Sequence, residues 1–212
     1  MQVEYIDKMG SDLTVVNAAR VSYSKQAEKF QDRDEKLLKF LAIHNHWSPF
    51  AHASIQFRIK APVFVARQLV KHQVGLVWNE VSRRYVDDEV EFYEPEDWRG
   101  APQNSKQGSS SEKIDINPSN MMVDDYEQVL SSAKWAYEEL LRKGVCPEQA
   151  RMVLPQSMMT EWYWSGTLMA FARVCNLRCK PDAQKETREV ADIIDNYGAN
   201  RFPYSWEALR NG

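Results

Sequence analysis

The segment 67–85, RQLVKHQVGLVWNEVSRRY, holds the densest group of polar side chains in the chain. Its first part has helical spacing, which puts Gln68 and His72 on one face. Its second part alternates like a strand, which points Glu80, Ser82 and Arg84 to one side. A carboxylate, a hydroxyl and a guanidinium on one edge suit an anionic, hydrogen-bonding ligand such as a nucleotide monophosphate. Spacing alone leaves a solvated charged hairpin open as the other interpretation.

Two other groups of residues could bind a metal. His44, His46 and His52 lie close together in the sequence, and imidazole is a common metal ligand. No acidic ligand motif accompanies them, so a histidine-based metal enzyme remains an alternative and no metal site is predicted. Cys175 and Cys179 lack a second cysteine pair, which favours buried free thiols over a structural zinc or a redox couple.

Composition bounds the class of protein. The 212 residues are 43% hydrophobic and 27% charged, with a net charge of −3, which is typical of a globular domain and not of a nucleic-acid binder. The aromatic run EWYWSG could stack bases, but the chain has no basic runs to accompany it. An odd number of cysteines, the lack of a long apolar run and the lack of a leader segment together predict a cytoplasmic protein that does not bind membranes.

Hydrophobic periodicity then predicts the elements that position the polar segment. Alternation predicts strands at 3–10, 53–61, 77–95 and 160–169. Helical spacing predicts helices at 12–19, 29–46, 62–72, 120–144, 146–155 and 170–177, and a last helix at 182–198. The polar, glycine-rich stretch at about 100–118 predicts a mobile loop. The result is a mixed α/β fold, one domain over 1–212, with a central antiparallel-rich sheet flanked by helices.

The segment FVARQLVKHQVGLVWNEVSRRY is similar to the signature of flavin-dependent thymidylate synthases. In that family an Arg-His-Arg triplet precedes a serine in an Asn-Glu-x-Ser-x-Arg-Tyr context. Here the triplet is Lys71-His72-Gln73, and Ser82 follows within NEVSRRY after eight residues. The blocks AARVS, HNHWSPFAH, EFYEP, ARMVLP, NLR and AQ-x-E resemble family blocks in the same order. The resemblance covers nearly the whole chain apart from 100–118.

This resemblance implies an activity and an assembly. The expected reaction is reductive methylation of dUMP to dTMP, with methylenetetrahydrofolate as the carbon donor and FAD, reduced by NADPH, as the hydride source. No enzyme nucleophile is implied, and a serine without an adjacent base is not activated. The expected assembly is a homotetramer with active sites between subunits.

The resemblance also implies site residues. Those for dUMP are Gln68, Glu80, Ser82, Arg83, Arg84, Arg151 and Arg178, with Ser82 and Arg178 as the catalytic candidates. Those for FAD are Ser22, His46, Ser48, Lys71, His72, Gln73, Glu80, Thr167, Arg173 and Leu177. The departures from the family pattern are Lys71 and Gln73 in the triplet, and Thr167, Met169, Arg173 and Asp182 on the flavin side. Lysine keeps the charge of arginine but loses its planar fork. If these changes abolish flavin binding, a non-enzymatic nucleotide-binding homologue is the alternative.

Overall fold

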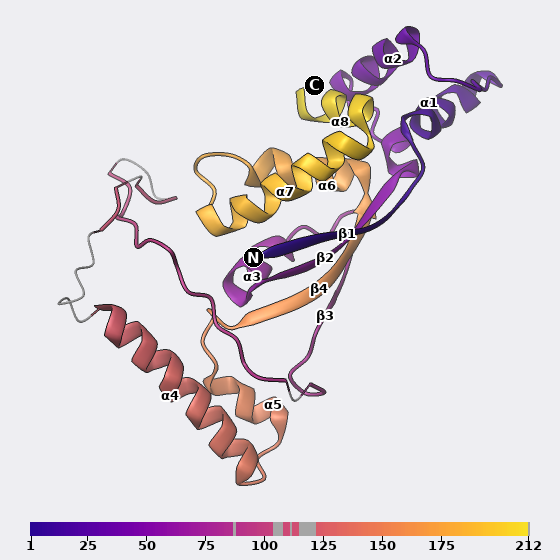
Figure 1. Ribbon diagram of the computed structural model, residues 1–212. Helices are drawn as coiled ribbons and strands as arrows, with labels where there is room; N and C mark the ends of the chain where they lie inside the picture. Colours follow the sequence, from indigo (N-terminus) through magenta and orange to yellow (C-terminus); the bar gives the residue numbers. More distant parts are fainter. Residues whose placement is uncertain (87, 104–107, 111, 115–121, 212) are drawn as a thin grey trace.

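The computed structural model describes residues 1–212 except 87, 104–107, 111, 115–121 and 212. A four-stranded antiparallel sheet lies at its centre, with strand order β1-β2-β4-β3 (Figure 1). The strands are β1 (Gln2–Met9), β2 (Ser54–Pro62), β3 (Leu76–Glu80) and β4 (Met159–Thr167). The prediction of a mixed α/β fold with an antiparallel-rich sheet is confirmed.

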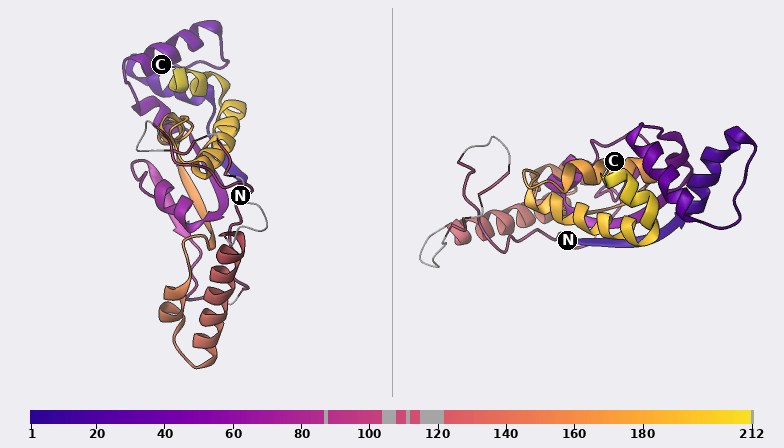
Figure 2. Two further views of the ribbon diagram at one scale, coloured as in Figure 1. Left: turned by 90° about the vertical axis from the view of Figure 1, so that its left-hand side faces the viewer. Right: turned by 90° about the horizontal axis from the view of Figure 1, so that it is seen from above.

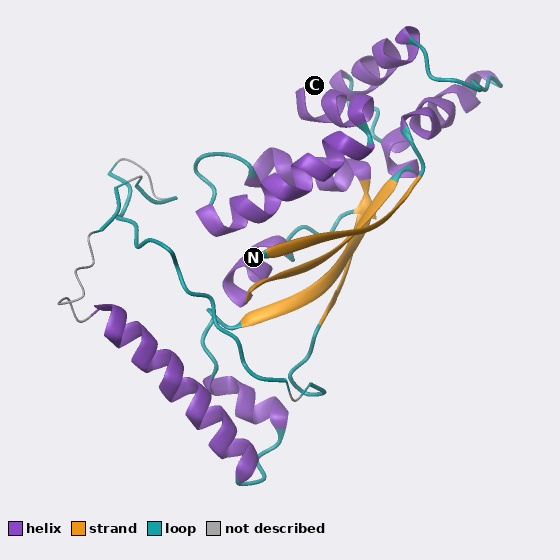
Figure 3. Ribbon diagram, viewed as in Figure 1, coloured by secondary structure: helices purple, strands orange, loops and turns teal. Residues whose placement is uncertain are grey.

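Alternating side chains give the sheet one buried and one exposed face. On β2, Ile55, Phe57 and Ile59 are buried, and Phe57 lies opposite the buried Trp164 of β4. Three helices cover this face, namely α3 (Val63–Leu69), α6 (Leu168–Arg178) and α7 (Lys185–Arg201) (Figure 3). The opposite face is polar; there Arg58 Nε donates to Glu161 Oε1 at 2.8 Å.

Helices pack together at one end of the sheet. They are α1 (Asp12–Arg20), α2 (Asp32–Ile43) and α8 (Pro203–Asn211), with the 3₁₀ helices η1 (Val21–Tyr23) and η2 (Ser48–His52). Ser11 is the N-cap of α1, as predicted. The prediction that the helix at 182–198 is the last one is wrong, because α8 follows it. Trp206 of α8 is buried against Gly198, a tertiary contact that a short amphipathic segment does not reveal.

The opposite end carries an arm made of α4 (Met122–Arg142), α5 (Pro147–Ala150) and the 3₁₀ helix η3 (Arg151–Val153). Gly144, with φ +84°, follows α4 as predicted. The arm has its own small hydrophobic cluster around Val90, Tyr137 and Ala150, distinct from the main core. Figure 2 shows the elongated shape that results, with α4 at one end and α1 and α2 at the other. Within the described residues, no helix has the length and apolar character needed to cross a bilayer.

The predicted strand at 77–95 is wrong beyond Glu80. The chain leaves the sheet in a turn in which the backbone N–H of Tyr85 donates to the carbonyl of Ser82 at 2.9 Å. The Arg83 guanidinium then donates to the backbone carbonyls of Asp88 and of Glu89, the latter at 3.2 Å. These side-chain bonds hold the segment in an irregular path, so alternation does not determine where its side chains point.

The predicted mobile loop at 100–118 falls partly outside the described residues. Its described parts are joined: Gly100 N–H donates to the Glu112 carbonyl at 3.2 Å, and Arg99 and Lys113 form an isolated antiparallel bridge. In addition, the Arg99 guanidinium donates to Glu186 on α7 at 2.6 Å. The base of the segment is therefore hydrogen-bonded to the rest of the chain.

Candidate active site

Two of the predicted nucleotide-site residues, Gln68 and Arg178, meet the predicted flavin residue His72 where the C-terminal ends of α3 and α6 lie together. Arg178 ends α6; its Nε donates to His72 Nε2 at 3.1 Å, and its Nη2 donates to the backbone carbonyl of Gln68 at 3.3 Å. Gln68 and His72 lie on one side of α3 and the turn after it, as their spacing predicts. Residues that are far apart in the sequence thus form one polar cluster.

His72 acts as a fixed acceptor in this cluster. Because its Nε2 accepts a hydrogen bond from a cation, the ring proton is on Nδ1. Burial, and then the charge of Arg178, lower the pKa of His72 below its usual value of 6.5. The imidazole is therefore neutral at pH 7. Burial also lowers the pKa of Arg178, but a guanidinium stays protonated.

The bonds to His72 and Gln68 use two of the five N–H donors of Arg178. They fix the plane of the guanidinium, and the remaining donors are available to a ligand. A cation held by neutral groups keeps its full charge for an acceptor that arrives from outside. The cluster is therefore prepared to bind an electron-rich, oxygen-bearing group.

The chain after His72 turns sharply at Gly75, whose φ is +77°. A Cβ at this position would lie 3.0 Å from Thr167 Oγ1 and 3.1 Å from Ala170 Cβ, so glycine suits both the conformation and the space. Thr167 is the N-cap of α6 and accepts a hydrogen bond from Ala170 N–H at 3.2 Å. The turn thus places β3 against the start of α6, and Thr167 serves as a helix cap in addition to any ligand contact.

Glu80, at the end of β3, has both carboxylate oxygens held. Thr160 Oγ1 on β4 donates to Oε1 at 2.7 Å, and Trp78 Nε1 donates to Oε2 at 3.1 Å. Thr160 is only 4% exposed, which makes its position rigid, whereas Glu80 is exposed. A carboxylate fixed in this way presents its remaining lone pairs in a defined direction.

The turn after β3 brings Ser82 and Arg84 into contact. Ser82 Oγ accepts from both the backbone N–H and the Nε of Arg84, each at 3.3 Å. Because the hydroxyl accepts from a cation, it is not activated as a nucleophile, but its own proton is free to be donated. Arg83 differs from its neighbours, since its guanidinium is used within the loop.

Most of the predicted flavin residues are exposed. Ser22 is in η1, His46 lies between α2 and η2, and Ser48 begins η2. Lys71 and Gln73 flank His72 in the turn after α3. On α6, Arg173 is exposed and Leu177 is 49% exposed.

These side chains fit the chemistry of FAD, which has a diphosphate and a flat, partly apolar ring system. Lys71 and Arg173 make no ion pair within the described part of the chain, so their charges are free for phosphates. The hydroxyls of Ser22 and Ser48 can donate to ligand oxygens. Leu177 adds apolar surface of the kind that an isoalloxazine needs.

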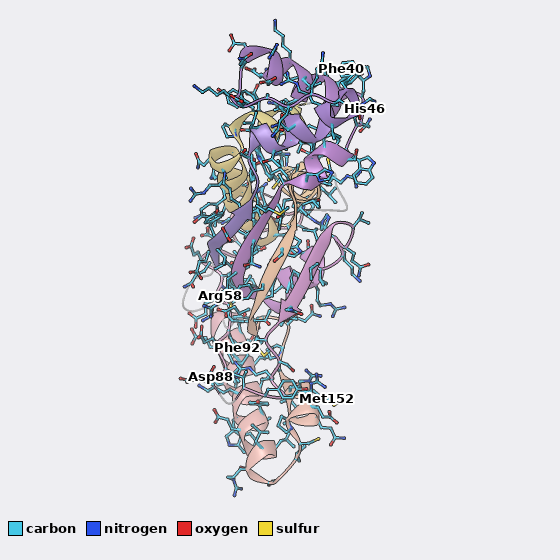
Figure 4. The ribbon with its side chains drawn as sticks, turned by 90° about the vertical axis from the view of Figure 1, so that its right-hand side faces the viewer. Phe40, His46, Arg58, Asp88, Phe92 and Met152 are labelled. Atoms are coloured by element: carbon cyan, nitrogen blue, oxygen red, sulfur yellow. The ribbon has the colours of Figure 1, made fainter. Side chains whose placement is uncertain are left out.

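One chain does not bring all the predicted residues together. Figure 4 labels His46 near one end of the molecule and Met152 near the other. Arg151 precedes Met152 in η3, on the arm, and its side chain is exposed. Ser22 and His46 belong to the helical end, whereas Arg151 belongs to the arm. The first two are assigned to FAD and Arg151 to dUMP, so a site that holds both ligands side by side needs residues from different chains.

The metal interpretation gains no support from the described residues. No group of three or more His, Cys, Asp or Glu side chains among them is arranged to hold a metal ion. The rings of His44 and His46 lie 6.3 Å apart and pack with Phe40. Cys175 is a buried free thiol, and Cys146 and Cys179 are also free.

Two residues of the cluster were missed by sequence reasoning. Gln68 Nε2 donates to the side-chain oxygen of Gln184, the N-cap residue of α7, and Glu186 lies two residues further on. Gln184 and Glu186 also line a cavity of about 330 Å³ with aromatic walls that include Tyr93 and Trp98. The AQ-x-E block was the available signal, since it contains both residues, but nothing in its spacing indicated which side chain it contacts.

Comparisons with known proteins agree over nearly the whole chain. The family model described as thymidylate synthase complementing protein matches residues 4–204. A flavin-dependent thymidylate synthase of Thermus thermophilus is 39% identical over 207 residues, which are 98% of this chain and 74% of that protein. Another, from Kosmotoga olearia, is 37% identical over 210 residues, which are 99% of this chain and 90% of that protein.

A solved structure shares the fold. The UMP/dUMP methylase PolB from Streptomyces cacaoi, bound with 5-Br dUMP, is 30% identical to this chain with a TM-score of 0.86. The match covers 99% of this chain and 94% of that one.

Proposed function

The chain belongs to the family of flavin-dependent thymidylate synthases, and on that premise we propose how its residues bind the substrate and cofactors. It methylates dUMP to dTMP and depends on FAD. We propose methylenetetrahydrofolate as the carbon donor and NADPH as the reductant of the flavin. The observation that carries the site is the Arg178 guanidinium, held by His72 and Gln68 with donors left over.

In this proposal, the two ends of dUMP bind to different groups. Arg178 and Gln68, both half-buried, face the uracil ring. The more exposed Arg84, together with the hydroxyl of Ser82 and Arg151 from another subunit, binds the phosphate, because a dianion needs several charge-assisted donors. Arg83 acts mainly by holding the loop in which Ser82 and Arg84 lie.

Bound reduced FAD supplies the hydride for the reaction. The chain's own residues bind, orient and polarise. Glu80, fixed by Thr160 and Trp78, holds an acceptor at the edge of the nucleotide site. Arg178 draws electron density towards the uracil oxygens, which favours attack on the ring. Lys71, Gln73, His46 and Ser48 hold the flavin from the surfaces on which they are exposed.

A variant of Arg178 tests the site. Arg178→Ala removes a charged donor to the ring, which is worth about 2–3 kcal/mol, so the Kd of dUMP should rise about 30- to 150-fold. Arg142→Ala, which removes an exposed arginine of α4 paired with Glu139, is the matched control and should bind dUMP normally. Equilibrium titration measures the Kd of dUMP for both variants, and an assay of dTMP formation then measures their activity. Unchanged dUMP affinity in Arg178→Ala would reject the site.

We also propose a homotetramer whose active sites are shared between subunits. It is supported by the placement of His46 near one end of the molecule and of η3, which contains Arg151 and the labelled Met152, near the other (Figure 4). Large apolar side chains exposed near these residues also support it. They include Val21, Tyr23, Trp47, Val74 and Met152.

Mixing two variants tests the shared site, at a dUMP concentration too low for either variant alone to be active. Arg178→Ala and Arg151→Ala chains, dissociated and reassembled together, should regain about a quarter of the wild-type sites, since each site draws its two arginines independently from different chains. Reassembling each variant alone is the control. If the mixture stays inactive although mixed oligomers form, both arginines come from one chain and the proposal fails.

Two smaller proposals complete the assignment. Residues 1–212 form a single domain, which is supported by the family match over 4–204 without a break. The protein is located in the cytoplasm, which is supported by its free thiols.

A further inference from the structure

A series of hydrogen-bonded residues connects Arg99, just before the segment 100–118, to the nucleotide site. Arg99 Nη2 donates to Glu186 Oε1 at 2.6 Å. Gln184 lies beside Glu186, and its side-chain oxygen accepts from Gln68 Nε2. Gln68 in turn accepts from Arg178 through its backbone carbonyl. The sequence resemblance assigned no role to Gln184 or Glu186.

Glu186 is the residue of this series whose hydrogen-bonding role cannot reverse, because an ionised carboxylate can only accept hydrogen bonds. Its side chain is 5% exposed. Burial raises the pKa of Glu186, but the hydrogen bond from Arg99 and smaller contributions, one of them from Gln184, outweigh it and leave the pKa below its usual range. Oε2 has no hydrogen-bond partner among the described residues. Oε2 is therefore a buried acceptor that favours any donor placed next to it.

The carboxylate decides which way the two amides point. An amide has a donor end and an acceptor end of nearly equal size, so its surroundings select the orientation. Beside an acceptor-only carboxylate, Gln184 must turn its NH₂ end to Glu186 and its oxygen to Gln68. Gln68 must then turn its own NH₂ end to Gln184, as the structure shows. The Oε1 of Gln68 is left as the end available to a ligand.

We propose that Glu186 and Gln184 are specificity-determining residues that make the site select uracil over cytosine by fixing the amide of Gln68. The proposal rests on the proposed dUMP site. Arg178, which is bonded to the backbone carbonyl of Gln68, offers a donor, and the side chain of Gln68 offers Oε1 as an acceptor. Uracil presents the complementary pair, a carbonyl oxygen next to the N3–H group.

Cytosine presents the opposite pattern, with an amino group in place of the C4 carbonyl and an unprotonated N3. Against the same two side chains it would set donor against donor and acceptor against acceptor. Sites that hydrogen-bond their substrate reject such mismatched analogues strongly, because polar groups are left unpaired. For a half-buried site we expect dUMP to bind about 100-fold more tightly than dCMP.

The test is equilibrium binding of dUMP and dCMP to the full-length protein at pH 8, where Glu186 is ionised. In Glu186→Gln the new amide can donate or accept, so both neighbouring amides are free to flip. The ratio of the two Kd values should fall at least tenfold, mainly because dCMP binds better. Arg99→Gln is the matched control: it breaks the same ion pair but leaves the carboxylate, so the ratio should be kept.

Gln184→Ala is a second variant, at the half-exposed start of α7, and it tests the relay if Glu186→Gln does not fold. It frees Gln68 to rotate, and the ratio should fall in the same way. A wild-type ratio in a folded Glu186→Gln or Gln184→Ala protein would overturn the inference while leaving the dUMP site intact. Failure of the wild-type protein to bind dUMP would instead reject the proposed site itself.

Discussion

Replacing His72 tests whether a neutral imidazole sets the position of Arg178. His72→Ala removes the acceptor that lies 3.1 Å from Arg178 Nε and leaves a donor of the cation unpaired. A hydrogen bond to a charged group contributes about 1.5–3 kcal/mol. Because His72 is only half-buried, water replaces part of this, and about 1–2 kcal/mol is expected. That corresponds to a rise of about 5- to 30-fold in the KM for dUMP.

The assay compares His72→Ala with His72→Gln. The Gln oxygen can occupy the place of Nε2 and accept from Arg178, so His72→Gln should recover most of the dUMP affinity. FAD content, measured by absorbance, separates this effect from loss of the flavin that His72 is also expected to contact. If His72→Ala retains FAD and its KM for dUMP stays within about twofold of the wild-type value, His72 does not position Arg178.

The same contact predicts a pH dependence. The pKa of His72 is lowered, so the neutral form and its bond to Arg178 are fully present above 6.5 and are lost as the pH falls through the lower pKa of the folded protein. Wild-type KM for dUMP should therefore rise below pH 6.5. The phosphate of dUMP also titrates in this range, but it does so equally in His72→Gln, which should lack the additional rise. Parallel profiles in the two proteins would contradict the assignment.

Three further substitutions probe other contacts. Thr160→Val keeps the shape of the side chain but removes the hydrogen bond to Glu80, so kcat/KM should fall about 5-fold with little change in Tm; equal activity would show that the carboxylate needs no such support. Gly198→Ala would place a Cβ 2.3 Å from Trp206 Cε2, so the Tm measured by calorimetry should fall by about 3–10 °C. An unchanged Tm would mean that α8 can shift away from α7 without cost. Asp34→Ala leaves Arg20, its ion-pair partner on α1, half-buried without a counter-charge, so the free energy of unfolding in urea should drop by about 3 kcal/mol. A drop below about 1 kcal/mol would mean that water reaches the pair.

Local patterns predicted the parts of this fold that local forces determine. The alternation of β2 and the helical spacing of Gln68 and His72 both correspond to the structure, because neighbours in the sequence decide them. The approach of Arg178 to His72 joins residues 106 positions apart, and no spacing rule predicts it. It was accessible only through the resemblance to a family.

The wrong predictions have physical causes as well. Alternation continues past Glu80 in the sequence, but a strand needs a partner with free hydrogen-bonding groups, and Arg83 instead binds the nearby backbone carbonyls. The helix α8 is short and depends on Trp206 packing against Gly198, which is a tertiary contact. In the proposed tetramer, the residues at the two ends of the molecule meet their ligands with the help of a second subunit, which the periodicity of one chain does not encode.

The separate hydrophobic cluster of the arm has a consequence for local stability. Its buried residues are Val90, Tyr137 and Ala150, whereas the main core extends through the sheet and the helices on it. Segments with few buried contacts open at lower free energy than the rest of a protein. Backbone amides of α4 and α5 should thus exchange with deuterium well before those of β2 and β4. Arg151, which we propose binds the phosphate, therefore lies on the part of the chain that should open first, and binding of dUMP should slow exchange most strongly there.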